Sequence, residues 1–506
     1  METNRNIFSN TNFISKNLIL GGVILLCLAI LSSLHFHNGF PLLLRDSINF
    51  LHRAFKLKES SHWSNTYTIY VAFIFRLFGT LQFVAIFQNL MVVGVLFIFC
   101  KHVLRSFTYL KFIGIIILLV FSTLPWISTM IMSDIFTPLT FIILFLFFEK
   151  RLSKSQLFIL TPILFIGLSS HQSHLAIIPI FVSGLLLSKI FRRKLGNKRN
   201  LLCLLGFIVV LFVVSNLFEK NIMNWVAPPK IDSSSNNEIN TNTESSTTTE
   251  IATKNADISS GYYFLAFRMY EAGQLDKLLE GFCGPDNTNY LCSDKEVAED
   301  EIRVKMVNYH KRHEDHYLYK IYSNDNKEFV LYCFLQPRFY YGCAKLVVMR
   351  GFKLMLNPNI QNYLNPRFVK DKKDLFIRDF NKLDPRDVAY YKKSKQKHIY
   401  YPKFIKKVFP VINMVWWKII LPITLIIFIV MFLRDRKLWS LAFDELYVIF
   451  WILYAHIVNT LICGTFSNFE NARYSSRTLW MINLGILILI NFLFNYRKGM
   501  RSKECS

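Results

Sequence analysis

The sequence predicts an all-α polytopic membrane bundle of about ten transmembrane helices, with a large, mainly helical, disulfide-containing insertion outside the membrane. The chain of 506 residues is 52% hydrophobic and only 18% charged, a balance that soluble globular proteins rarely have. Its apolar residues gather in long runs, and Lys and Arg gather in the short segments between them. The net charge of +25 therefore indicates membrane topology, and we expect no nucleic-acid partner.

The predicted spans follow from length. A transmembrane helix needs about 20 mostly apolar residues to cross about 30 Å of hydrocarbon. The apolar segment Thr66–Phe78 contains Arg76 and stops at Gly79, so we expect a helix that lies in the membrane interface within the first outer loop, 35–79. The segments that meet or approach the required length are 17–34, 81–100, 112–128, 135–148, 155–170, 175–190, 201–218, 411–433, 446–463 and 478–496.

The basic clusters assign the orientation, because short cytoplasmic loops collect Lys and Arg. With a cytoplasmic N-terminus, every cluster and the C-terminus lie in the cytoplasm, and residues 219–408 lie outside. No small-residue cleavage motif follows the first apolar run, so we expect it to be retained as an anchor. The clusters follow alternate predicted spans, at Lys101–Lys111, Lys150–Lys154, Lys189–Arg199, Arg434–Lys437 and Arg497–Lys503.

Four regions result from this topology. They are an N-terminal bundle (1–218), an outer linker (219–260), an extracytoplasmic domain (261–408), and C-terminal membrane helices with a basic tail (409–506). The linker assignment rests on Asp232–Lys254, a Ser/Thr/Asn-rich segment that cannot bury a core.

Cysteine usage agrees with an outer location for the domain. Four of the nine Cys fall there as two local pairs, Cys283/Cys292 and Cys333/Cys343, and an oxidising compartment favours two disulfides. Four free thiols are the alternative. A zinc site is disfavoured, because neither CxxC spacing nor paired His accompanies these cysteines.

Candidate functional residues gather in the outer loops. The middle of the predicted spans holds almost no ionisable side chain, which argues against a proton-coupled transporter. A carboxylate can take a proton from an acceptor hydroxyl, while Arg and His neutralise a departing phosphate. The candidate catalytic residues are Asp46, Asp134, His171 and His174, and the candidate substrate- or phosphate-binding residues are Arg45, Glu470, Arg473 and Arg477.

Each candidate also has a structural alternative. Asp46 and Asp134 could cap the helices that follow them. His171 and His174 could satisfy a polar helix end or bind a metal, and the arginines could anchor the tenth span at the interface. Clustering on one membrane face favours the functional interpretation.

The chain resembles the glycosyltransferase C superfamily in three features. These are about ten spans, an acidic residue (Asp46) beside an interfacial helix in the first outer loop, and another Asp (Asp134) in the second outer loop. Members of the superfamily are polytopic enzymes that take sugars from polyprenyl-phosphate donors. The resemblance covers mainly the first four spans. It implies that Asp46 acts as the base or binds a metal, that Asp134 assists it, and that Arg473 binds the lipid phosphate. Arg45 and His52 surround Asp46 in place of a second acidic residue, so a requirement for Mg²⁺ or Mn²⁺ stays open.

The chain is also similar, through most of its length, to a family of bacterial inner-membrane proteins of unknown function. This similarity implies a bacterial inner-membrane location and strengthens the site, but it names no reaction. The matching residues are Pro41–Ser47, Met132–Thr137, His171–His174, Phe264–Arg268, Cys283, Cys292, Cys463-Gly464 and Arg473–Arg477.

We expect a membrane glycosyltransferase that moves a sugar from a polyprenyl-phosphate donor to an extracytoplasmic glycan, lipid or protein. The basic, Tyr-rich stretch Arg367–Lys407 would recognise an anionic lipid or glycan acceptor. One alternative is a transferase of acyl or phospho-alcohol groups, in which His456 of the ninth span would matter. The other is a non-enzymatic component of envelope assembly or of lipid or glycan export. The sequence has no P-loop, no dinucleotide fingerprint and no nucleophile elbow.

Overall fold

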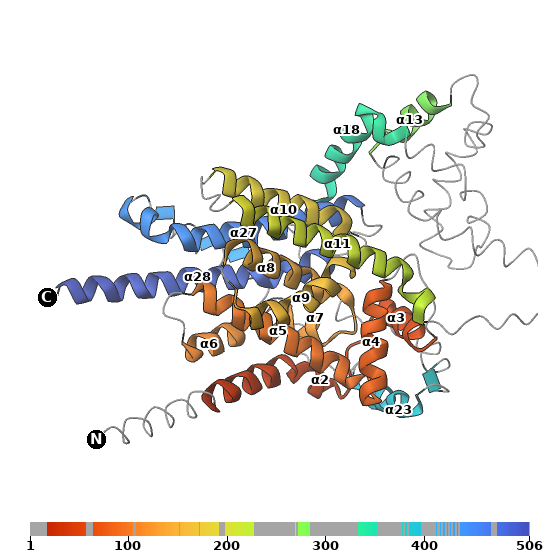
Figure 1. Cartoon of the computed structure of the whole chain (residues 1–506), viewed down its shortest axis with the longest axis horizontal. Helices are drawn as coiled ribbons and strands as arrows, with labels where there is room; N and C mark the ends of the chain where they lie inside the picture. Colours follow the sequence, from red (N-terminus) through yellow and green to blue (C-terminus); the bar gives the residue numbers. More distant parts are fainter. Residues whose placement is uncertain are drawn as a thin grey trace, which may run out of the picture.

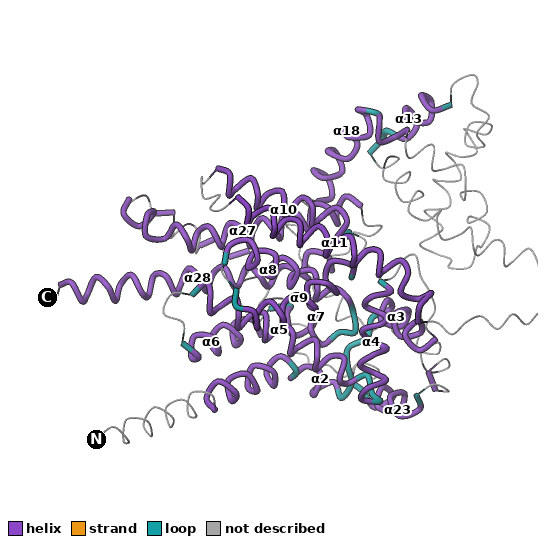
Figure 2. The backbone as a smooth tube through the Cα atoms, viewed as in Figure 1, coloured by secondary structure: helices purple, strands orange, loops and turns teal. Residues whose placement is uncertain are grey.

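The computed structural model is almost entirely helical (Figure 2). Among the residues it describes, the backbone pairs as a β-bridge only between Leu42 and Met130. The described residues are 18–56, 64–104, 108–120, 122–150, 152–171, 173–191, 198–226, 272–283, 332–351, 384–395, 436–466 and 473–504, with scattered single positions at 269, 354, 377, 380–381 and between 411 and 433.

Three helices in this part of the chain are long and apolar enough to cross a membrane. They are α5 (Gln82–Val103) and the apolar stretches Ala442–Gly464 of α27 (Arg436–Phe466) and Tyr474–Tyr496 of α28 (Arg473–Glu504). The chain is therefore a helical membrane protein, and the count of ten spans stays a prediction.

Several other predicted spans form shorter helices. The stretch 112–128 is divided between α6 (Tyr109–Val120) and α7 (Leu124–Thr129). The division falls where Pro125 fills one of the first positions of α7, a place that suits proline because a helix start leaves N–H groups unpaired anyway. The remaining shorter helices are Leu18–Leu31, α8 (Phe136–Glu149), α9 (Lys154–Ser169), α10 (His174–Phe191) and the apolar stretch Leu204–Glu219 of α11 (Lys198–Val226).

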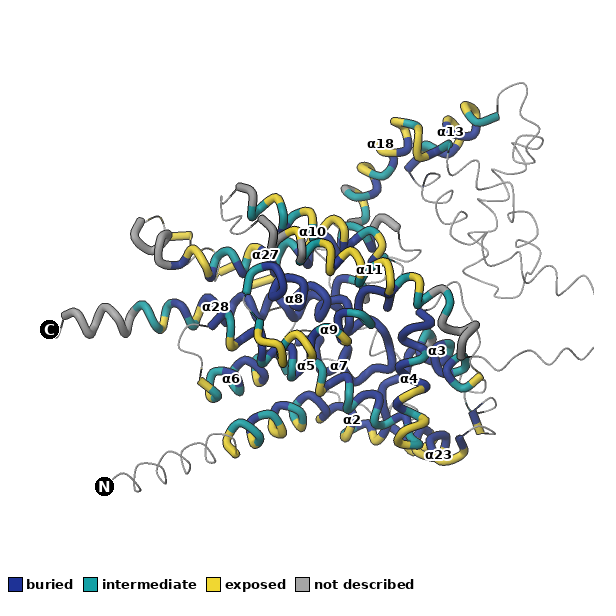
Figure 3. Tube along the Cα trace, viewed as in Figure 1, coloured by how far each residue is buried: buried dark blue, intermediate teal, exposed yellow. Residues whose placement is uncertain are grey.

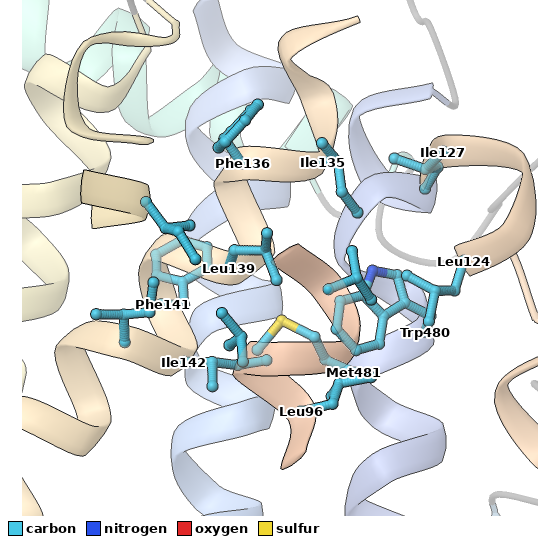
Figure 4. Close-up of a cluster of buried hydrophobic side chains, with 14 of the residues drawn as sticks. Leu96, Leu124, Ile127, Ile135, Phe136, Leu139, Phe141, Ile142, Trp480 and Met481 are labelled. Carbon is cyan, nitrogen blue, oxygen red and sulfur yellow. The ribbon is translucent and has the colours of Figure 1, made fainter. Parts of the chain in front are cut away.

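Helix α8 is the centre of the bundle. It is apolar on every side, and a helix of that composition is stable only when surrounded by other elements. Figure 3 shows it buried along its length, and Figure 4 shows its side chains between those of α5, α7 and α28. This position matters for function, because the short 3₁₀ helix η1 (Ser133–Ile135) leads directly into α8 and carries Asp134.

One end of the bundle is closed by the segments of the first outer loop. These are α2 (Ser33–Asn38), α3 (Arg45–Lys56) and α4 (Asn65–Phe78). Helix α4 confirms the helix expected over 66–78 and runs across the direction of α28 and α11 (Figure 1). Gly79 ends it in the left-handed conformation at φ 66°, which glycine adopts at little cost. Its location in a membrane interface stays a prediction.

Helix α11 continues to Val226, past the end expected at 218, and its extension holds the start of α4. The Glu219 carboxylate accepts hydrogen bonds from the backbone N–H groups of Asn65 and Thr66, the latter at 2.6 Å. A helix N-terminus carries partial positive charge and unpaired N–H groups, so a carboxylate there is stabilising. The region expected to be linker from residue 219 thus begins as a helix that fixes the first outer loop.

The described part of the outer domain has a small apolar core of its own. Helix α13 (Leu275–Phe282) and helix α18 (Pro337–Leu346) pack there (Figure 1), and α18, with the short helix η2 (Val347–Gly351) that follows it, also contacts α27 of the main bundle. The expected disulfide between Cys333 and Cys343 is wrong, because both are free thiols in this core. Burial raises the pKa of the Cys333 thiol to about 12, so it acts as a small apolar side chain.

The other expected disulfide has only one member within the described residues. Cys283 follows α13 and is disulfide-bonded. Cys292 lies outside the described residues, so the pairing of Cys283 with Cys292 stays a prediction.

Candidate functional site

The first two outer loops are joined by backbone hydrogen bonds. The N–H of Leu42 donates to the carbonyl of Thr129 at 3.2 Å, and the N–H of Ile131 donates to the carbonyl of Leu42 at 3.1 Å. This pairing fixes the segment before α3 against the segment before η1. The loops that carry Asp46 and Asp134 are therefore neighbours.

Arg477, in the second turn of α28, joins the second loop to the last one. Its Nη1 lies 3.5 Å from Oδ1 of Asp134, and the exposed fractions of the two side chains are 0% and 1%. Nε and Nη2 donate to Oδ1 of Asn459 at 2.9 and 2.7 Å. Nη2 also contacts Sγ of Cys463 at 3.0 Å and Oγ of Ser173 at 3.4 Å. We call these five residues the Arg477 cluster.

The two long C-terminal helices position this cluster. Asn459 and Cys463 are four residues apart on α27 and thus share a face. The Asn459 side-chain NH₂ donates to the carbonyl of Tyr474 at 2.6 Å and to Oγ1 of Thr478 at 3.1 Å, which holds α27 against α28. The Tyr474 ring lies 5.2 Å from the Arg477 guanidinium, within range of a cation–π interaction. A buried guanidinium needs such a full set of partners, because desolvating it is costly.

His174 is buried and joins three helices. Its Nδ1 lies 2.6 Å from the carbonyl of Gly167 on α9, and its Nε2 lies 2.8 Å from Oγ1 of Thr137 on α8. A carbonyl oxygen can only accept, so Nδ1 carries the hydrogen. Helices α8 and α9 approach closely here, since a Cβ at Gly167 would collide with Oγ1 of Thr140. His174 therefore packs inside the bundle, between α8, α9 and α10.

His171 occupies a different environment and is only half-buried. Its Nδ1 lies 2.8 Å from Oγ of Ser173 and accepts from the Ser173 backbone N–H at 3.2 Å. Its ring packs edge-on against Tyr474, with centroids 5.9 Å apart. The third outer loop thereby meets the last one, and Ser173 connects His171 to the Arg477 cluster.

Asp46 lies in the first turn of α3 and is half-buried. The Leu44 N–H donates to Oγ of Ser47 at 2.9 Å, so Ser47 helps to start this helix. Asp46 is not among the partners of Arg477 within the described residues. The structure thus joins Asp134 directly to Arg477 and joins His171 to Arg477 through Ser173, while Asp46 lies on the adjoining first outer loop.

Three predicted site residues have side chains that the structure does not describe. Arg45 and Arg473 are the first residues of α3 and α28. Glu470 lies in the segment 467–472, outside the described residues. Their roles in binding a substrate phosphate stay predictions, as does that of the fully buried Arg477.

Two functional-site residues were not predicted. Asn459 supplies the main acceptor for Arg477, and Glu219 fixes the first outer loop against α11. An amide inside an apolar run is a signal for Asn459, because polar side chains in a span need a partner. The signal for Glu219 was weaker. An acidic residue at the end of a predicted span is also expected where a solvent-exposed loop begins.

The surroundings of Asp134 do not suit a divalent cation. Its carboxylate already faces the Arg477 guanidinium, and a second positive charge there would be repelled. No group of three or more His, Cys, Asp or Glu residues forms a metal-binding cluster within the ranges that the structure describes.

Comparisons of the chain with protein-family models, with characterised proteins and with solved structures give no significant match.

Proposed function

We propose that the chain is a membrane glycosyltransferase that moves a sugar from a polyprenyl-phosphate donor to an extracytoplasmic glycan, lipid or protein. The observation that carries this proposal is the difference between two neighbouring carboxylates. Asp134 is buried against Arg477, whereas Asp46 is half-buried on the adjoining loop. A base must be within reach of its substrate, so we assign proton transfer to Asp46 and positioning to Asp134.

The proposed step is a single displacement at the sugar. The acceptor hydroxyl oxygen attacks the anomeric carbon and forms the new glycosidic bond. The bond between that carbon and the phosphate oxygen breaks, and polyprenyl phosphate leaves with the bonding electrons. The hydroxyl proton passes to the Asp46 carboxylate, whose negative charge also favours the positive charge that develops on the sugar ring.

Arginines at helix starts would receive the leaving phosphate in this proposal. Arg45 begins α3 and Arg473 begins α28. A guanidinium binds two phosphate oxygens at once, and the N–H groups of a helix start add further donors. The basic, Tyr-rich stretch Arg367–Lys407 is the proposed site for an anionic acceptor.

The test is complementation of a strain that lacks the gene, combined with mass spectrometry of envelope glycans and lipids. Asp46→Asn should accumulate normally in the membrane and fail to complement, and one glycan should lose a sugar. The matched control is Asp444→Asn, which removes an exposed carboxylate from the first turns of α27 and should complement fully. Full complementation by Asp46→Asn would refute the proposal.

One observation favours a second candidate, a non-enzymatic component of envelope assembly or export. The Arg477 guanidinium is fully buried and is surrounded by other side chains of the protein. A polar cluster of this kind can serve only to hold helices together. That function requires Arg477 and tolerates Asp46→Asn, so the same complementation experiment distinguishes it.

A further inference from the structure

Helix α23 (Pro385–Lys393) is docked on the closed end of the bundle, more than 300 positions from the segments that it contacts. The Asp387 carboxylate accepts from Oγ1 of Thr80 at 2.7 Å and from the backbone N–H of Leu81 at 2.6 Å. The Tyr391 ring packs edge-on against Phe40, with centroids 5.9 Å apart. One face of α23 is thus bound to the turn between α4 and α5 and to the first outer loop.

The opposite face of α23 is exposed and basic. Arg386, Tyr390 and Lys393 are exposed and recur at the spacing of one helix face, and Lys392 is exposed beside them. Nη2 of Arg386 lies close to Gly79, at the edge of the turn between α4 and α5. The acidic residues of this segment, Asp384 and Asp387, are both buried. Every exposed charged side chain of α23 is therefore positive, and Figure 3 shows exposed stretches of this helix alternating with buried ones.

Helix α4, which ends at the turn that Asp387 binds, has exposed apolar side chains on either side of the exposed Arg76. Phe73 and Leu77 of α4 are each 61% exposed, and they lie one helical turn apart shortly before the turn that Asp387 binds. Apolar side chains exposed to this degree on a membrane protein are suited to lipid tails. A basic helix with an exposed Tyr, together with the exposed apolar side chains of α4, has the composition of a segment at the level of lipid headgroups.

We infer that the exposed face of α23 binds the headgroups of anionic phospholipids. Arg386 and Lys393 would contact the phosphates, and Tyr390 would lie between them at the boundary of the apolar region. This contact would hold the outer domain against the membrane beside the candidate site. Helix α23 lies within the stretch Arg367–Lys407 proposed above to bind an anionic acceptor, and this inference assigns its exposed face to membrane phospholipid instead, whatever reaction the chain catalyses.

The experiment places a fluorescent reporter on this face. The full chain with Tyr390→Trp is reconstituted in phosphatidylcholine nanodiscs that contain either brominated phosphatidylglycerol or brominated phosphatidylcholine. Bromine quenches tryptophan on contact, and the chain with Tyr390→Phe supplies the background from native tryptophans. We expect Trp at 390 to be quenched more strongly by brominated phosphatidylglycerol.

Charge variants then test the contact directly. Adding Arg386→Gln and Lys393→Gln should raise the amount of brominated phosphatidylglycerol needed for half-maximal quenching by on the order of tenfold. The matched control, Lys277→Gln with Arg338→Gln, removes two exposed basic charges from α13 and α18 and should change nothing.

Three results would overturn the inference. They are equal quenching by the two lipids, unchanged quenching in the charge variant, and no quenching by either lipid. In the last case, a change in Trp fluorescence on addition of a soluble polyanionic glycan would assign the face to that class of ligand instead.

Discussion

At the scale of single residues, the Arg477 cluster is the feature on which the site depends. Arg477 and Asp134 come from positions 343 residues apart and meet in a fully buried ion pair. A pair of this kind adds little net stability when it is complete, but removal of one partner leaves a buried charge without its counter-ion. The pair joins α28 to the short helix η1 that leads into α8.

We expect Asp134→Asn to destabilise the protein by about 3–5 kcal/mol, because the guanidinium stays buried and loses its counter-ion. Thermal unfolding in detergent, followed by fluorescence, measures this. Asp444→Asn serves as the control, since this exposed residue is not part of a buried pair. An unchanged midpoint for Asp134→Asn would show that the ion pair does not hold the bundle together.

We expect Gly167→Ala to destabilise the contact between α8 and α9 by roughly 1–3 kcal/mol, because the added methyl meets Oγ1 of Thr140. The second change Thr140→Ala removes that atom and should restore part of the loss. The free energy of unfolding of the two single variants and the double variant forms the test. Additive losses would contradict the proposed collision.

At the scale of helices, the docking of α23 should depend on pH through Asp387. Burial is the largest cause that raises the pKa of this carboxyl from 3.8 to about 6. The hydrogen bonds from Leu81 and Thr80 oppose the shift. A carboxyl whose pKa is raised by folding contributes stability that is complete below its unfolded pKa and is lost as pH rises through its folded pKa.

We therefore expect acidification from pH 7 to pH 5 to stabilise the native chain relative to the Asp387→Asn variant, whose side chain does not titrate. The measurement is the unfolding midpoint of both proteins across this range. Identical pH slopes for the two proteins would contradict the prediction.

The helices also show what sequence patterns can predict. Long apolar runs located α5, α27 and α28, and Gly79 marked the end of α4. The expected disulfide between Cys333 and Cys343 was wrong, because local spacing does not reveal that both thiols lie in an apolar core. The docking of α23 and the capping of α4 by Glu219 were beyond prediction, since each joins residues more than 150 positions apart.

At the scale of the whole molecule, the two ends of the described chain lie on one side of the bundle, and their cytoplasmic location stays a prediction. The helix that begins at Leu18 and the C-terminal end of α28 lie at one end of the bundle, and α3, α4 and α23 lie at the other (Figure 1). The sequence predicted that four outer loops share one face of the membrane. These loops carry Asp46, Asp134, His171 and Arg477. Contacts join the first loop to the second, and the second and third loops to the last one; Asp46 is not among the described partners of Arg477.

We expect a green fluorescent protein fused after Ser506 to be fluorescent, because the C-terminus is predicted to be cytoplasmic and this reporter matures in the cytoplasm. Alkaline phosphatase inserted in the linker 219–260 should be active, because it requires an oxidising compartment. A non-fluorescent C-terminal fusion together with an inactive linker insertion would show that the chain has the opposite orientation. The candidate site would then face the cytoplasm.

The most direct test of the account is the amount of polyprenyl-phosphate-linked sugar in membranes of cells that carry Asp46→Asn, relative to cells that carry Asp444→Asn. The account predicts that the lipid-linked sugar accumulates and that its glycosylated product disappears in the Asp46→Asn cells alone, at equal abundance of the two proteins. Equal levels of donor and product in the two strains would contradict the assignment of Asp46 as the base and of the chain as a glycosyltransferase.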